Sequence, residues 1–77
     1  MSNTADIQHI LADADPEFRA WAHEHQQCET RLDELTHKNE ITVDEEIEEK
    51  TLKKRKLHLK DQMAERIRSY ESQHAVA

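Results

Sequence analysis

Two apolar patterns with helical periodicity, separated by a short link, constrain the fold of this 77-residue chain more than any other feature. The first pattern runs from Phe18 to Leu35 in alternating steps of three and four residues, the seven-residue repeat of a helix packed on another helix. The second runs from Leu52 to Tyr70 along one stripe of a 3.6-residue helix. The signals described below leave only residues 40–43 between the two helices. Helices joined by so short a link must lie side by side. We therefore predict an all-α protein, an antiparallel, coiled-coil-like helical hairpin with a short N-terminal helical segment.

Local signals place the first long helix at residues 15–39. Asp15 is suited to cap the free amides, and Pro16 suits the first helical position. At the other end, Asn39 is predicted to adopt the left-handed conformation that usually falls to Gly at a helix end. The chain contains no Gly, so Asn39 is the natural terminator.

A second set of signals places the turn at residues 40–43 and the second helix at 44–72. Thr42 and Glu45 have the spacing of a capping box, in which each side chain binds the backbone amide of the other residue. No helix-breaking residue follows before the end of the pattern. Residues 73–77 are expected to form a disordered tail.

Residues 1–14 are predicted to form a short helical segment or arm of the same single domain. Ile7, Ile10 and Leu11 lie at helical spacing, but short isolated helices are marginal in water. The segment therefore needs a docking surface, which the aromatic side chains at the start of the first long helix would offer. A docked segment and a mobile arm both fit the sequence.

The inner faces of the two long helices are expected to hold the hairpin together. The predicted core residues are Phe18, Trp21, Leu32, Leu35, Leu52, Leu59, Met63, Ile67 and Tyr70. So few large apolar side chains make a thin core for a chain of this length, and self-association would help to stabilise it.

The composition argues against an enzyme. A P-loop, a Rossmann fingerprint and a nucleophile elbow all need Gly, and the chain has none. The many carboxylates lie on predicted exposed helix faces, and two helices offer no deep pocket for a small molecule. We expect no catalytic residues, no cofactor and no small-molecule substrate.

The sequence also favours a cytoplasmic location. The N-terminus lacks a basic stretch followed by an apolar one, so no secretion signal is expected. No apolar run approaches the ~20 residues that span a bilayer. The single cysteine, Cys28, excludes an intramolecular disulfide.

His23, His25 and Cys28 are the residues that most resemble a metal site. Imidazole and thiolate groups are zinc ligands, but a closed zinc site needs four. The facing part of the second helix offers only His58 and Asp61. We therefore interpret His25 and Cys28 as small polar members of the packed seam, with an inert thiol, and expect no metal.

A basic run in the second helix is a candidate for nucleic-acid contacts. It consists of Lys50, Lys53, Lys54, Arg55, Lys56 and Lys60. Basic helix faces bind phosphates, but the net charge is −6, and residues 1–40 carry nine acids against three bases. No aromatic residue is interleaved to stack on bases. A solvated face, partly paired with the first helix, is the favoured interpretation.

Leu57 lies off the inner stripe of the second helix. With Val43 and Ile47 it would form a second, smaller apolar line on the far side. Scattered exposed apolar residues need no explanation, but a continuous line would favour a dimer, a larger bundle or a partner helix. Ile47 and Leu57 are the interface residues to test first.

Four stretches of the chain resemble the YdcH-like family of small bacterial proteins, a family of unknown function. They are Asp15-Pro16-Glu17-Phe18, Glu24-His25, Glu29-Thr30-Arg31-Leu32 and Leu52-Lys53-Lys54-Arg55-Lys56-Leu57-His58-Leu59-Lys60-Asp61. The resemblance extends from about Ile7 to Tyr70. It implies a cytoplasmic bacterial helical hairpin and brings no activity or catalytic residues.

The leading hypothesis is a non-enzymatic helical interaction or adaptor protein that self-associates or binds a helical protein partner. The alternative is a nucleic-acid-associated protein that uses the basic stripe of the second helix.

Overall fold

The computed structural model describes residues 4–74, which form three α-helices and no strand. These are α1 (Thr4–Ala14), α2 (Pro16–Thr36) and α3 (Val43–His74). The prediction of an all-α protein is confirmed. None of the three helices is both long and apolar enough to cross a membrane.

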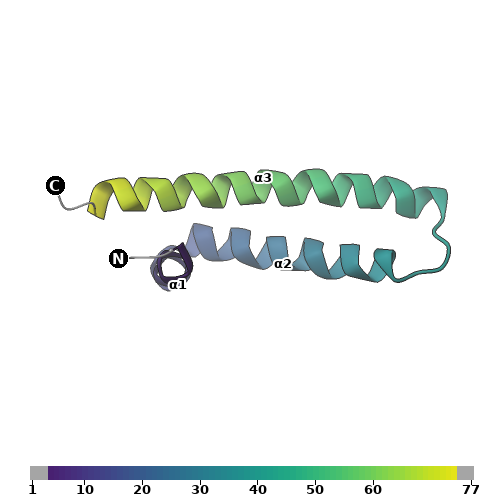
Figure 1. Cartoon of the computed structure of the whole chain (residues 1–77), viewed down its shortest axis with the longest axis horizontal. Coiled ribbons are helices and arrows are strands. Elements are labelled where there is room, and N and C mark those ends of the chain that lie inside the picture. Colours follow the sequence, from purple (N-terminus) through teal and green to yellow (C-terminus); the bar gives the residue numbers. More distant parts are fainter. Residues whose placement is uncertain (1–3, 75–77) are drawn as a thin grey trace.

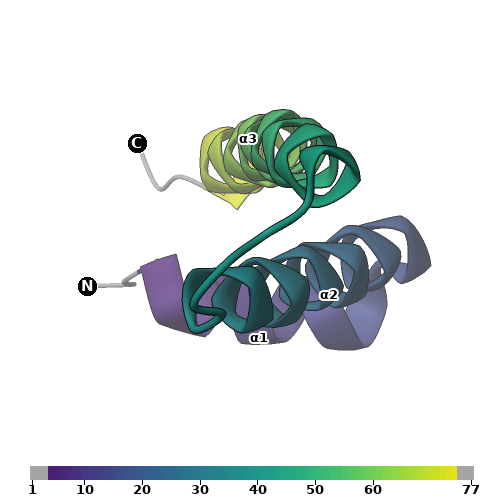
Figure 2. The same cartoon turned by 90° about the vertical axis from the view of Figure 1, so that its right-hand side faces the viewer.

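The helices form two thin layers. α2 and α3 lie side by side, run in opposite directions and are joined at one end of the molecule (Figure 1). α1 lies across the other end in the layer of α2, so that α3 covers both (Figure 2). The molecule measures 54 × 21 × 16 Å. A body this narrow leaves most side chains on a surface.

Asp15 forms the corner between α1 and α2, as its capping role predicts. Its backbone is extended (φ −116°, ψ 103°), and its carboxylate accepts hydrogen bonds from the amides of Glu17 (3.0 Å) and Phe18 (3.3 Å). Its own amide donates to the carbonyl of Leu11 at 2.7 Å. One residue therefore ends α1 and begins α2, and the chain turns sharply between them.

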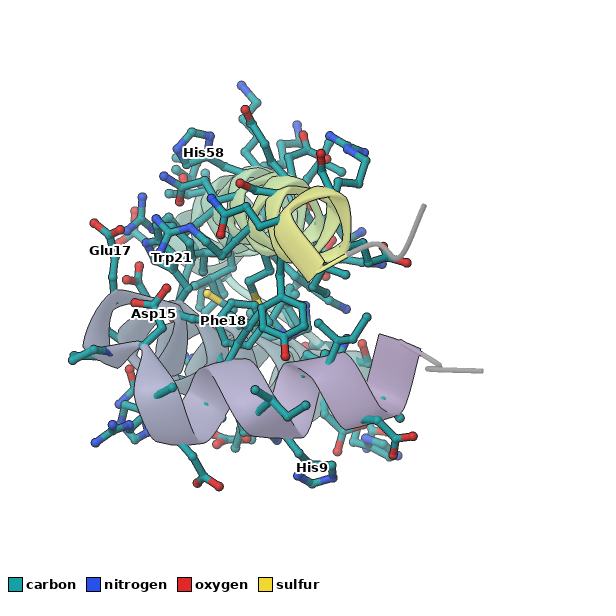
Figure 3. All side chains as sticks on the ribbon, turned by 90° about the vertical axis from the view of Figure 1, so that its left-hand side faces the viewer. His9, Asp15, Glu17, Phe18, Trp21 and His58 are labelled. Atoms are coloured by element: carbon teal, nitrogen blue, oxygen red, sulfur yellow. The ribbon has the colours of Figure 1, made fainter. Side chains whose placement is uncertain are left out.

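The main core cluster lies where α1 meets the long helices. Its buried members come from all three helices: Ile7, Leu11, Phe18 and Ile67. Phe18 lies between the layers (Figure 3). Ile10, which shares the helical spacing of Ile7 and Leu11, is instead exposed, because α1 turns its other side toward the core. α1 is therefore docked; residues 1–3 lie outside the described part.

The predicted core residues are divided between buried and half-buried positions. Phe18, Leu35, Leu59 and Ile67 are buried. Those that are half-buried are Trp21, Leu32, Leu52, Met63 and Tyr70. Cys28 is also buried, as a free thiol. Half-burial of so many inner side chains is a direct result of having only two layers.

The end of α2 differs from the prediction. The helix stops at Thr36 and not at Asn39. No described residue has a positive φ angle, so the left-handed conformation predicted for Asn39 is wrong. His37 caps the helix in a right-handed conformation (φ −87°, ψ −1°), and the amide of Lys38 donates to the carbonyl of Leu35 at 3.3 Å. This tightened last turn satisfies the free carbonyls without a left-handed residue.

The predicted capping box at the start of α3 is confirmed. The amide of Thr42 donates to the Glu45 carboxylate at 2.9 Å, and the amide of Glu45 donates to the Thr42 hydroxyl at 3.1 Å. α3 begins at Val43 and extends to His74, so the first two residues of the predicted disordered tail, 73–77, are helical. The last three lie outside the described residues.

A substitution at Leu59 tests this packing, because Leu59 is 0% exposed. We expect Leu59→Ala to lower the free energy of unfolding by about 3 kcal/mol, since truncation removes apolar contacts and leaves a cavity. Urea denaturation followed by circular dichroism measures this. Val43→Ala, at an exposed position, should change it by less than ~0.5 kcal/mol. Equal effects of the two substitutions would contradict the assigned core.

Candidate interaction surface

One flank of the α2–α3 pair is crossed by several ion pairs, and a hollow of about 270 Å³ lies beside Trp21 and Arg66 at its end. Glu17, Glu24 and Arg31 recur every seven residues on α2, a spacing that returns to the same side of a packed helix. Nη2 of Arg55 donates to Glu24 at 2.9 Å, and Nε of Arg31 donates to Glu48 at 2.7 Å. We call this side the bridged flank.

Arg66 anchors the bridged flank at the end where α1 lies. Its guanidinium, on α3, pairs with the carboxylates of both Asp15 and Glu17. It also lies over the ring of Trp21, 4.9 Å from the ring centroid, where a cation is attracted to the π face. Figure 3 shows Asp15, Glu17 and Trp21 gathered at this corner. The capping residue of α2 is thereby also attached to α3.

These ion pairs lower the pKa values of the carboxyl groups that they contain. Hydrogen bonds from Arg55, Arg31 and Lys38 hold the pKa values of Glu24, Glu48 and Glu45, respectively, below their usual range. For Asp15, desolvation acts to raise the pKa, but hydrogen bonds from the Phe18 amide and from Arg66 outweigh it and lower the pKa. These carboxyl groups are therefore ionised at neutral pH and can form the ion pairs described above.

The opposite flank is hollowed. One hollow, of about 490 Å³, is lined by Leu32 and Lys56 among others, and the same two residues line a second hollow of about 360 Å³. Lys60 lines this second hollow and also a third, of about 240 Å³, near α1. The shared residues connect the three hollows along one side of the molecule. We call this feature the groove.

The groove has an apolar floor and oppositely charged walls. Its apolar lining residues are Leu32, Leu57, Met63, Ala64 and Ile67. The α2 wall carries the acids Glu29 and Asp33, and the α3 wall carries the bases Lys53, Lys56 and Lys60. Nζ of Lys56 lies 3.2 Å from Oε1 of Glu29, so the two walls meet at the same height along the helices.

His25 is a polar member of the groove. It lines the hollow near α1, and its buried Nε2 has no hydrogen-bond partner within residues 4–74. A carboxylate oxygen of Glu29 is 4.0 Å away, too far for a hydrogen bond. A buried polar atom without a partner is costly.

The predicted outer apolar line lies on the surface. Val43, Ile47 and Leu57 are all exposed, and Leu57, at 60%, lines the groove beside Leu32. Val43 and Ile47 belong to the part of α3 nearest the connection to α2. The sequence could identify Leu57 as off the inner stripe, but not Leu32 as its neighbour.

The structure divides the predicted basic stripe. Arg55 pairs with Glu24 on the bridged flank, whereas Lys56 pairs with Glu29 in the groove. Lys53 lies 3.4 Å from Glu49 on its own helix. Of the six, Lys50, Lys54 and Lys60 have no ion pair within the described part of the chain. The six residues therefore do not form one continuous basic surface.

The metal candidates are not assembled into a site. His23 is exposed, His25 is half-buried and Cys28 is buried. Among residues 4–74, no group of three or more His, Cys, Asp or Glu side chains is arranged to hold a metal ion.

Sequence reasoning overlooked the importance of Arg31 and Arg66. The heptad spacing of Glu17, Glu24 and Arg31 was a usable signal for charges flanking a helix seam. No comparable signal distinguished Arg66 from the other cations of α3.

Comparison with known proteins identifies one family. A family model described as a protein of unknown function (DUF465) matches residues 18–75. YdcH-like proteins belong to this family, so the resemblance seen in the sequence is confirmed. No curated protein and no solved structure matches the chain.

The lowered pKa values predict a loss of stability in acid. Each of these carboxyl groups has a lower pKa in the folded state than in the unfolded chain, so the unfolded state binds more protons as the pH falls. We expect the melting temperature to hold at neutral pH and to fall as the pH drops below 4.5, the ordinary pKa of a glutamate. Thermal melts at a series of pH values measure this.

Glu24→Gln should reduce this acid dependence, because it removes one of the contributing carboxyl groups. Glu46→Gln, at an exposed position, should keep the wild-type profile. A melting temperature that is unchanged in acid, or identical profiles for the two variants, would contradict the role of the ion pairs.

Proposed function

Because the chain belongs to the DUF465 family, whose function is unknown, we propose from its structure that it is a non-enzymatic helical interaction protein. It self-associates or binds a helical protein partner, and the groove is its contact surface. The coiled-coil-like hairpin of α2 and α3 is the scaffold, and the protein works in the bacterial cytoplasm, where a free thiol such as Cys28 stays reduced.

The observation that carries this proposal is the apolar floor of the groove. A single exposed Leu on a surface has no special meaning. Here Leu57 and the half-buried Leu32 line one hollow, and the hollows continue to Met63 and Ile67 beside α1. Contiguous apolar surface rimmed by charged residues is typical of protein contact sites. The long, narrow shape of the groove suits a helix.

The arrangement of reactive groups supports a non-enzymatic role. The acids with lowered pKa values are held by Arg or Lys in ion pairs between or within elements, which leaves them no proton to exchange near neutral pH. The thiol of Cys28 is buried. These carboxylates and this thiol therefore stabilise the fold and are not placed to react with a substrate.

Leu57→Asp tests the contact surface. We expect it to abolish cross-linked complexes captured from the native host, because a carboxylate in the groove opposes burial of the apolar floor. Thr51→Asp places the same charge at an exposed position elsewhere on α3 and should leave capture unchanged. Both variants should keep the helical signal of the wild type in circular dichroism, and Thr51→Asp should also keep its melting temperature. If Leu57→Asp captures as much cross-linked complex as the wild type, the groove is not the contact surface.

Nucleic-acid binding is the second candidate, and it is favoured by one observation. Lys50, Lys54 and Lys60 have no acidic partner within residues 4–74, so they are free to contact phosphates. The net charge of −6 opposes it. If it holds, fluorescence anisotropy with labelled duplex and single-stranded probes will show binding that weakens steeply with salt. The triple Lys→Ala variant should lose that binding. No salt-dependent binding at low ionic strength would eliminate this candidate.

A further inference from the structure

We infer that the groove is filled by a second copy of this chain, in a dimer where α2 of each copy lies over α3 of the other. The result is a four-helix bundle with a continuous core. This inference rests on the proposed function, and it names the partner.

The charges of the groove walls carry the inference. The acids of the α2 wall and the bases of the α3 wall lie at matching heights, as the 3.2 Å contact between Glu29 and Lys56 shows. A two-fold axis parallel to the helices keeps every residue at its height and exchanges the walls. The acidic wall of one copy then faces the basic wall of the other, twice in the dimer.

The alternative symmetric arrangement is disfavoured by the same charges. A two-fold axis perpendicular to the helices and in the plane of the groove places α2 on α2 and α3 on α3. Acids such as Asp33 would then face acids, and Lys53 and Lys60 would face lysines. Juxtaposed like charges suppress such an interface.

The apolar groups and the size of the face agree with a second copy. Leu32 and Leu57 of both chains would be covered together, which supplies the burial that one thin molecule lacks. The molecule extends over 54 × 21 Å in the two directions of this face, which leaves room for the ~800 Å² per partner that a stable interface buries.

Asp33 and Lys53 are the residues with which to test the arrangement. They line opposite walls. Counted from the Glu29–Lys56 contact at ~1.5 Å per residue, both lie toward the turn, at nearly the same height. Their side chains are 74% and 66% exposed, and their ion pairs within the chain are weak local ones. Charge reversal at either position should therefore leave the fold of the single chain intact.

The experiment is sedimentation equilibrium on the full chain, on each of Asp33→Lys and Lys53→Glu, and on their equimolar mixture. We expect the wild type to dimerise and each variant alone to have a dimer dissociation constant raised by tenfold or more, on the order expected for facing like charges. The mixture should recover the wild-type constant. In the mixed dimer the new lysine faces the new glutamate, and the native Asp33 faces the native Lys53.

Lys54→Glu is the matched control. Lys54 is exposed one residue from Lys53 but is not a lining residue of the 360 Å³ hollow, so its reversal should leave the constant unchanged. Circular dichroism at low concentration should give the same helical signal for all variants.

Three results would overturn the inference: a wild type that stays monomeric at ~1 mM, a mixture no tighter than its components, or an equal effect of Lys54→Glu. These outcomes leave the proposed function in place if capture from the host still depends on Leu57. Capture that no longer depends on Leu57, while the wild type dimerises as described, would instead refute the groove as the surface that binds other proteins.

Discussion

The carboxylate of Asp15 is the constraint on which the arrangement of the three helices depends. It caps α2 through the amides of Glu17 and Phe18, while the amide of the same residue closes the last turn of α1 on Leu11. Arg66 of α3 completes the corner. A chain without Gly has few ways to turn sharply, and here an extended Asp followed by Pro makes the turn between two helices. α1 is thereby directed under α3, where Ile7 and Leu11 are buried.

Beyond that corner, the two flanks of the helix pair have different roles. The bridged flank is held by Arg55 and Arg66 of α3 and by Arg31 of α2, each paired with carboxylates of the other helix. The groove has a single ion pair across it among those described, Lys56 with Glu29, and leaves its apolar floor open. A two-layer molecule cannot enclose both flanks with so few side chains. The flank with the open apolar floor is therefore the proposed contact surface.

Local chemistry explains which expectations were confirmed. The capping box of Thr42 and Glu45 and the cap at Asp15 involve residues two or three positions apart, so the sequence shows both partners together. The predicted end of α2 at Asn39 was wrong because a helix terminates equally well through a tightened last turn. Ile7 and Ile10 share one periodic pattern, and only the direction in which α1 docks determines that Ile7 is buried and Ile10 exposed.

By itself, the sequence determined the helical class, the start signals of the long helices and most of the inner stripe, because these depend on spacings within a single helix. The tertiary structure decided which charges meet. Arg66 joins Asp15, and Leu57 joins Leu32 in a groove, only because α3 lies beside α2 at one particular register. That register sums many weak contacts between residues distant in the chain, and no single motif encodes it. The groove therefore emerged only from the folded molecule, although the thin core already led us to expect self-association.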